Sequence, residues 1–168
     1  ATTALGVEAA EFGRLCDSFW IDLSKGLGCP VGAVLAGSPE FIEEVWRWKQ
    51  RIGGAMRQAG ILAAAGLYAL DHHLERLVED QDNALAFAQA VEAFPQVAID
   101  MESVQSNIVY FDIPGRDAAA VSATLSAEGV EIGAMGTQTL RAVTHLDVSK
   151  EQVLKAAAVV GAVLAGNS

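Results

Sequence analysis

The sequence predicts a mixed α/β fold in two lobes, because its hydrophobic period changes along the chain. In residues 1–78, short apolar runs rich in aromatic and β-branched residues flank a glycine-rich stretch, and a long helical pattern follows. In residues 79–168, the pattern reads as helix, two strands, helix, two strands and helix. That order is typical of a small α+β sandwich. We therefore expect two structural parts, residues 1–78 and residues 79–168.

The composition indicates a folded chain and excludes two classes of partner. Of the 168 residues, 52% are hydrophobic, and the mean hydropathy is +0.31, which is ample for a packed core. No window reaches the ~18 uninterrupted apolar residues of a membrane span. The 11 basic and 21 acidic residues give a net charge of −10, which disfavours nucleic acid and anionic membranes as partners.

The termini and cysteines favour a cytoplasmic location. Ala1–Gly6 has no basic region followed by an apolar core, so we expect no signal peptide. Cys16 and Cys29 lack metal-ligand spacing and suit a reducing compartment.

The first lobe is predicted to contain helix 8–14, strand 19–23, strand 33–36, helix 40–52 and a long helix 56–79. Aromatic and β-branched residues in 19–23 are typical of a strand buried on at least one face. Ser38 precedes Pro39 and an acidic first turn, which indicates a helix N-terminus. Two apolar stripes on the long helix predict a wide buried face.

The second lobe is predicted to contain helix 81–94, strands 97–101 and 108–111, helix 117–127, strands 130–132 and 140–144, and helix 150–164. Pro95 should end the first of these helices. Ser149 and Gln152 have the spacing of a capping box ahead of the last one.

Lys25 lies in the stretch that we expect to carry the chemistry. It follows a predicted strand and precedes the glycines of Gly26–Gly32. Ligands of open α/β sheets collect at the carboxyl ends of strands, where glycine allows close approach of the backbone. A phosphate-binding loop would need its glycines before the lysine, and here they follow it. Two interpretations remain: a solvated loop lysine, or a partly desolvated lysine that condenses with a carbonyl cofactor such as pyridoxal phosphate.

Four stretches, in register, resemble low-specificity threonine aldolases, which are pyridoxal-phosphate enzymes of the aspartate-aminotransferase fold type. These stretches are residues 17–38 around Lys25, residues 48–70 with the run Gly-Gly-Ala-Met-Arg-Gln, Gln105–Asn107, and Leu140–Ser149. The resemblance implies that residues 1–78 are the C-terminal part of the large cofactor domain of fold type I with its connecting helix. Residues 79–168 would be the small C-terminal domain. The family's chains are considerably longer, so the N-terminal half is expected to be missing here.

The resemblance implies cleavage of β-hydroxy-α-amino acids, such as threonine or allo-threonine, to glycine and acetaldehyde. Lys25 would hold pyridoxal 5'-phosphate as an imine, with Ser24 and Arg57 also binding the cofactor. Arg141 would bind the substrate α-carboxylate through a two-pronged contact. On sequence alone, an arginine within an apolar strand fits a structural salt bridge equally well.

Other interpretations stay open. The chain could be a different enzyme of the same fold type, such as a β-eliminating lyase or a hydroxymethyltransferase, or a non-catalytic remnant, or a fragment. We expect activity to require the missing half, in a homo-oligomer or with a companion chain. We expect no metal at His72-His73, because adjacent helical residues point about 100° apart.

Overall fold

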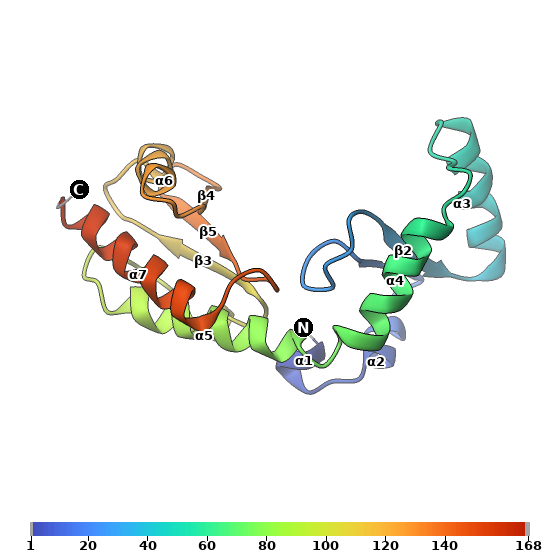
Figure 1. Cartoon of the computed structure of the whole chain (residues 1–168), viewed down its shortest axis with the longest axis horizontal. Coiled ribbons are helices and arrows are strands. Elements are labelled where there is room, and N and C mark those ends of the chain that lie inside the picture. Colours follow the sequence, from blue (N-terminus) through green and yellow to red (C-terminus); the bar gives the residue numbers. More distant parts are fainter. Residues whose placement is uncertain (1, 167–168) are drawn as a thin grey trace. The chain divides into compact units, whose positions relative to one another are not determined.

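The structure is a computed structural model that describes residues 2–166. It separates into two compact units, one spanning Thr2–Leu77 and the other beginning at Val78. In Figure 1 the first unit runs from blue to green and the second from green to red. Among the described residues, no helix combines the length and apolar character needed to cross a membrane.

The first unit is built around a two-stranded ribbon. Its elements are α1 (Thr2–Leu5), α2 (Ala9–Gly13), β1 (Ser18–Asp22), β2 (Ala33–Gly37), α3 (Pro39–Arg51) and α4 (Gly60–His72). The strands are antiparallel, with Ser18 opposite Gly37 and Asp22 opposite Ala33. The glycine-rich stretch that contains Lys25 is therefore the connection of a β-hairpin.

The ribbon exposes its apolar side chains, so the prediction of a strand buried on at least one face is wrong for this chain. Trp20 is 69% exposed, and Phe19 and Ile21 are also exposed. A two-stranded ribbon has too few neighbours to cover either of its faces.

Helix α3 follows the prediction, whereas α4 is shorter than predicted. The Ser38 side chain accepts a hydrogen bond from the Phe41 N–H at 3.2 Å, which caps α3. Residues 53–59 are irregular, with Gln58 at φ 53°, so α4 starts at Gly60 and not at 56. It ends at His72 instead of 79, and it buries only Gly66 and Ala69. The wide buried face predicted for this helix is therefore wrong in this unit.

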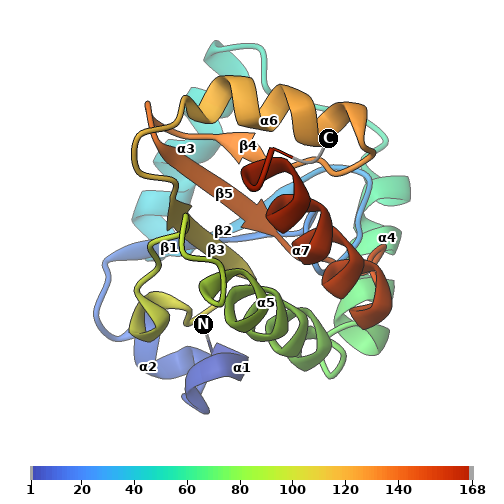
Figure 2. The ribbon, with the colours of Figure 1, turned by 90° about the vertical axis from the view of Figure 1, so that its left-hand side faces the viewer.

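The second unit packs three α-helices on a three-stranded antiparallel sheet of order β3-β5-β4 (Figures 1 and 2). Its elements are α5 (Leu77–Glu92), the 3₁₀ helix η1 (Met101–Ser103), β3 (Ile108–Asp112), α6 (Ala118–Ala127), β4 (Gly133–Ala134), β5 (Thr139–Val143) and α7 (Lys150–Leu164). Along β3 and β5, successive residues alternate between buried and more exposed positions.

One face of this sheet forms the core. Val109 and Phe111 of β3 and Leu140 and Ala142 of β5 are buried together with side chains of α5, α6 and α7. All three helices therefore cover the same face of the sheet. The opposite face presents alternate residues such as Arg141.

Two predicted strands of this unit are displaced. In place of strand 97–101, only Ala98 bridges to Asp112, and the chain then turns into η1. The Asp100 side chain accepts a hydrogen bond from the Glu102 N–H, which favours that turn. The strand predicted at 130–132 is found at Gly133–Ala134. The predicted capping box of α7 is confirmed.

Candidate functional site around Lys25

Residues 23–32, which we call the lysine loop, form a closed connection between β1 and β2. The Gly28 N–H donates to the Lys25 carbonyl at 2.8 Å, and the Cys29 N–H donates to the Leu23 carbonyl at 2.9 Å. The Leu23 N–H in turn donates to the Gly32 carbonyl at 3.0 Å. Gly28 and Gly32 have φ values of 72° and 122°, which other residues rarely adopt. The glycines are therefore needed to close the loop.

The Lys25 side chain lies on the open side of this loop. It is 60% exposed and forms an ion pair with Asp22. The partly desolvated amine expected from the sequence is thus not seen in this unit. Ser24 and Lys25 are brought together with a carboxylate that sequence reasoning missed.

Asp22 accepts hydrogen bonds from the turn that follows it, in addition to its ion pair with Lys25. Its Oδ1 accepts hydrogen bonds from the Ser24 N–H at 3.0 Å and the Ser24 Oγ at 2.8 Å. The hydrogen bond from Lys25, followed by those from Ser24, holds the pKa of Asp22 far below its usual range. An aspartate two residues before a serine at a strand end was the available signal, because this spacing is typical of an Asx turn.

The inner side of the lysine loop packs on α4. Leu23, Leu27 and Cys29 are buried together with Ala69, and Ala65 packs against them. A Cβ placed on Gly66 would lie 3.4 Å from Leu23 Cδ1, which is an ordinary van der Waals contact, so helix and loop pack closely but leave room for a methyl group.

Two polar side chains beyond the end of α4 contact the backbone of the lysine loop. His73 Nδ1 lies 2.6 Å from the Leu27 carbonyl oxygen, and Arg76 Nη1 donates to the Gly26 carbonyl at 3.4 Å. The sequence pattern indicates His73 only as half of a possible metal pair with His72. His72 packs on the Tyr68 ring at a centroid distance of 4.3 Å. No group of three or more His, Cys, Asp or Glu residues that could hold a metal is found in the described part of the chain.

Arg57 and Arg141 lie outside the lysine loop. Arg57 is exposed in the irregular segment 53–59 and does not open a helix as predicted. Arg141 is in β5 of the second unit, opposite Tyr110. Its Nε is buried and has no hydrogen-bond partner among the described residues. A buried donor without an acceptor is costly, so this guanidinium suits an anionic ligand.

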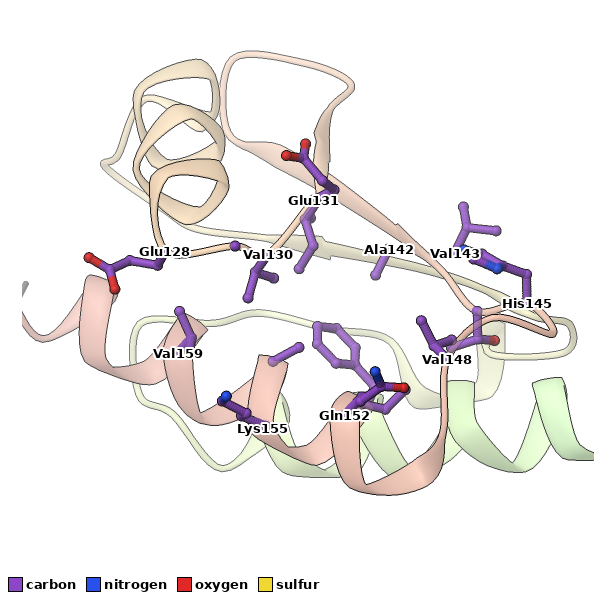
Figure 3. Close-up of a pocket in the computed structure, with 16 residues that line it drawn as sticks. Glu128, Val130, Glu131, Ala142, Val143, His145, Val148, Gln152, Lys155 and Val159 are labelled. Atoms are coloured by element: carbon purple, nitrogen blue, oxygen red, sulfur yellow. The ribbon is translucent and has the colours of Figure 1, made fainter.

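The second unit also has a groove of about 410 Å³ between α7 and β5 (Figure 3). Phe87, Ala142 and Val153 contribute apolar lining, while Glu128 and Lys155 add charged groups. The groove is therefore distinct from the predicted site, because its described lining includes none of the four site residues predicted from the sequence, Ser24, Lys25, Arg57 and Arg141.

Comparison with known proteins decides the family. Residues 1–114 match the model of the β-eliminating lyase family. The chain belongs to this family. A low-specificity L-threonine aldolase of Escherichia coli (strain K12) is 44% identical over 158 residues, which cover 94% of this chain and 46% of that protein. A probable low-specificity L-threonine aldolase 2 of Arabidopsis thaliana is 36% identical, over 91% of this chain and 44% of that protein. The resemblance identified in the sequence is thereby confirmed.

Solved structures of related proteins show the same fold. A proposed L-allo-threonine aldolase from Listeria monocytogenes matches with a TM-score of 0.75 at 22% identity, covering 99% of this chain and 49% of that one. The predicted fold class, an α/β chain that forms part of fold type I, is confirmed. The chain spans about half the length of the curated relatives that it matches.

Proposed function

We propose that this chain is the lysine-bearing part of a pyridoxal-phosphate enzyme that cleaves β-hydroxy-α-amino acids, such as threonine or allo-threonine, to glycine and an aldehyde. The observation that carries the proposal is the position of Lys25. Its amine lies on the open side of a closed, glycine-rich loop whose inner side is buried against α4. The names of the relatives support threonine as the substrate class.

The residues present fit the cofactor in chemical type. A primary amine is the group that bonds the cofactor aldehyde, and Lys25 presents one to solvent. The Ser24 hydroxyl and the exposed Arg57 guanidinium are suitable donors for a phosphate. When bound there, pyridoxal phosphate would supply an electron sink for the carbon atom left by Cα–Cβ cleavage.

The remaining roles follow from the same chemistry. Lys25 would hold the cofactor covalently, after its amine leaves Asp22. Arg141 would bind the substrate α-carboxylate, since its buried Nε lacks an acceptor among the described residues. In this proposal the first unit is part of the cofactor domain and the second unit is the small domain.

We also propose a cytoplasmic enzyme that works as a homo-oligomer or with a companion chain. Cys16 and Cys29 are both free thiols, which suits a reducing compartment. The exposed apolar side chains of the ribbon favour association.

The test is to map the cofactor onto the chain. Borohydride reduction of a preparation loaded with pyridoxal phosphate should fix the cofactor mass on the peptide that contains Lys25. Label on Lys49, Lys150 or Lys155 instead would remove the basis of the proposal. Acetaldehyde released from threonine should be measured in the same preparation.

A second candidate is β-elimination, which the description of the family model favours. The two activities give different products. Pyruvate from serine, without acetaldehyde from threonine, would select the β-eliminating lyase.

A further inference from the structure

The lysine loop depends on its backbone to place Lys25. The Lys25 side chain is 60% exposed, so little packing restrains it. The loop also contains Gly26, Gly28 and Gly32, and glycine gives a chain more conformations to sample than any other residue. A precise position for the amine therefore requires contacts that restrain the loop from outside.

His73 makes such a contact. Its Nδ1 lies 2.6 Å from the carbonyl oxygen of Leu27, two residues after Lys25. Arg76 reaches the neighbouring Gly26 carbonyl at 3.4 Å, a longer and weaker contact. Both side chains follow α4, the helix on which the inner side of the loop is buried.

The chemistry of this contact suits a permanent restraint. A carbonyl oxygen only accepts hydrogen bonds, so Nδ1 of His73 must carry the proton. The neutral ring can donate from Nδ1, and the protonated ring donates there as well. The contact is therefore available in both charge states of the ring.

The surroundings of His73 fix the direction of that donation. Its ring meets the Tyr68 ring at a centroid distance of 5.5 Å with an interplanar angle of 85°. Edge-to-face packing of this kind favours one ring orientation. The acceptor belongs to Leu27, whose side chain is buried on α4.

We infer that His73 is a positioning residue for Lys25. By holding the Leu27 carbonyl, it fixes the turn that presents the Lys25 amine, and it contacts neither cofactor nor substrate itself. The inference rests on the proposed function of Lys25, and it adds a residue that acts on Lys25 through the loop backbone.

The experiment compares three variants of His73. His73→Leu removes the donor, His73→Asn keeps an N–H close to the position of Nδ1, and His73→Gln moves the N–H about one bond further out. His72→Leu is the matched control, because His72 packs on Tyr68 at the neighbouring position. The first readout is hydrogen exchange of the Gly28 and Cys29 amides, which close the loop.

Loss of one hydrogen bond of this kind should speed exchange of these amides about tenfold in His73→Leu. His73→Asn should restore protection, whereas His73→Gln should not, and His72→Leu should match the wild type. If His73→Leu does not fold, the comparison of Asn with Gln decides alone. Wild-type protection in His73→Leu, or equal loss in Asn and Gln, would overturn the inference.

The second readout uses an active assembly, in which this chain is combined with the half that the proposed function expects beside it and is loaded with pyridoxal phosphate. His73→Leu should lower kcat about tenfold and leave KM for threonine within about twofold, because substrate contacts are untouched. His73→Asn should recover most of kcat. A wild-type chain without borohydride label on Lys25 would refute the proposed function and this inference together. Label on Lys25 with an unaffected His73→Leu variant would refute the inference alone.

Discussion

Asp22 both stabilises the turn at the start of the lysine loop and binds the Lys25 amine. The same carboxylate accepts from Ser24 and pairs with Lys25. Because folding lowers the pKa of Asp22, the stability that it contributes is fully present at neutral pH. It is lost only as the pH falls below the usual range of aspartate. Around neutral pH, Asp22 therefore competes for the amine that the proposed function requires.

Arg141 gives the first prediction at the residue scale. In an active assembly, Arg141→Lys should weaken amino-acid binding far more than cofactor binding, because lysine keeps the charge but loses the planar fork. We expect a loss of about 2–4 kcal/mol in apparent transition-state binding. The measurement is kcat/KM for threonine, together with the cofactor content of the purified preparation.

The matched control for this substitution is Arg47→Lys. Arg47 is an exposed residue of α3 that pairs with Glu43 one helical turn away. Arg47→Lys should leave threonine cleavage unchanged, since exposed ion pairs of this kind contribute little to stability. Unchanged cleavage in Arg141→Lys would show that Arg141 has a structural role.

The sequence was sufficient to single out Lys25 and Ser24, but not the residues that hold them. A lysine between a strand and a run of glycines is a local pattern. His73 and Leu27, by contrast, are 46 residues apart, and their contact depends on how α4 packs against the loop. No local pattern specifies that contact.

At the scale of elements, the helices that begin with a capping side chain were predicted best. Ser38 and Ser149 cap α3 and α7 as their sequences indicate, because capping depends on neighbours three residues away. The break between α4 and α5 lies at residues 73–76 and not near residue 80 as predicted, since no glycine or proline marks it in the sequence. His73 and Arg76 contact the loop there, so tertiary contacts override local helix propensity.

Two helical glycines provide the next prediction. A Cβ on Gly161 of α7 would lie 2.4 Å from the Phe94 ring, whereas one on Gly66 of α4 would meet Leu23 Cδ1 at 3.4 Å. Gly161→Ala should therefore lower the free energy of unfolding of the second unit by about 1–2 kcal/mol, despite alanine's better helix propensity. Gly66→Ala should leave the first unit unchanged or raise its stability by up to about 1 kcal/mol.

Urea unfolding can follow the two units separately. All three tryptophans, Trp20, Trp46 and Trp48, lie in the first unit, so their fluorescence reports on Gly66→Ala. Far-UV circular dichroism reports on both units. A Gly161→Ala chain as stable as the wild type would show that the Phe94 ring moves without cost.

At the scale of the whole molecule, the two strands of the ribbon have the apolar composition of strands inside a sheet, but no other described strand pairs with them. Phe19, Ile21 and Val34 lie on one face, and Trp20 and Leu35 lie on the other. All five are exposed. The sequence pattern correctly indicated strands, but burial depends on surfaces that these residues do not supply themselves.

The last prediction is that the isolated chain associates and does not turn over threonine efficiently. The two apolar faces of the ribbon, and its outer strand edges, which pair with no other described strand, favour contact with other chains. We expect sedimentation of residues 1–168 to show species larger than the monomer at micromolar concentration. Trp20→Glu, at a side chain that is 69% exposed, should shift the distribution toward monomer.

Leu154→Glu on α7 is the control for that shift, because Leu154 is also exposed but lies in the second unit. It should leave the association unchanged if the ribbon is responsible. Threonine cleavage should be assayed in the same samples with added pyridoxal phosphate. The ribbon faces are open to water, and water competes for the hydrogen bonds and charges that a cofactor site needs. Efficient turnover by a homogeneous monomer would contradict the prediction, because it would show that the chain forms a complete site from its own residues.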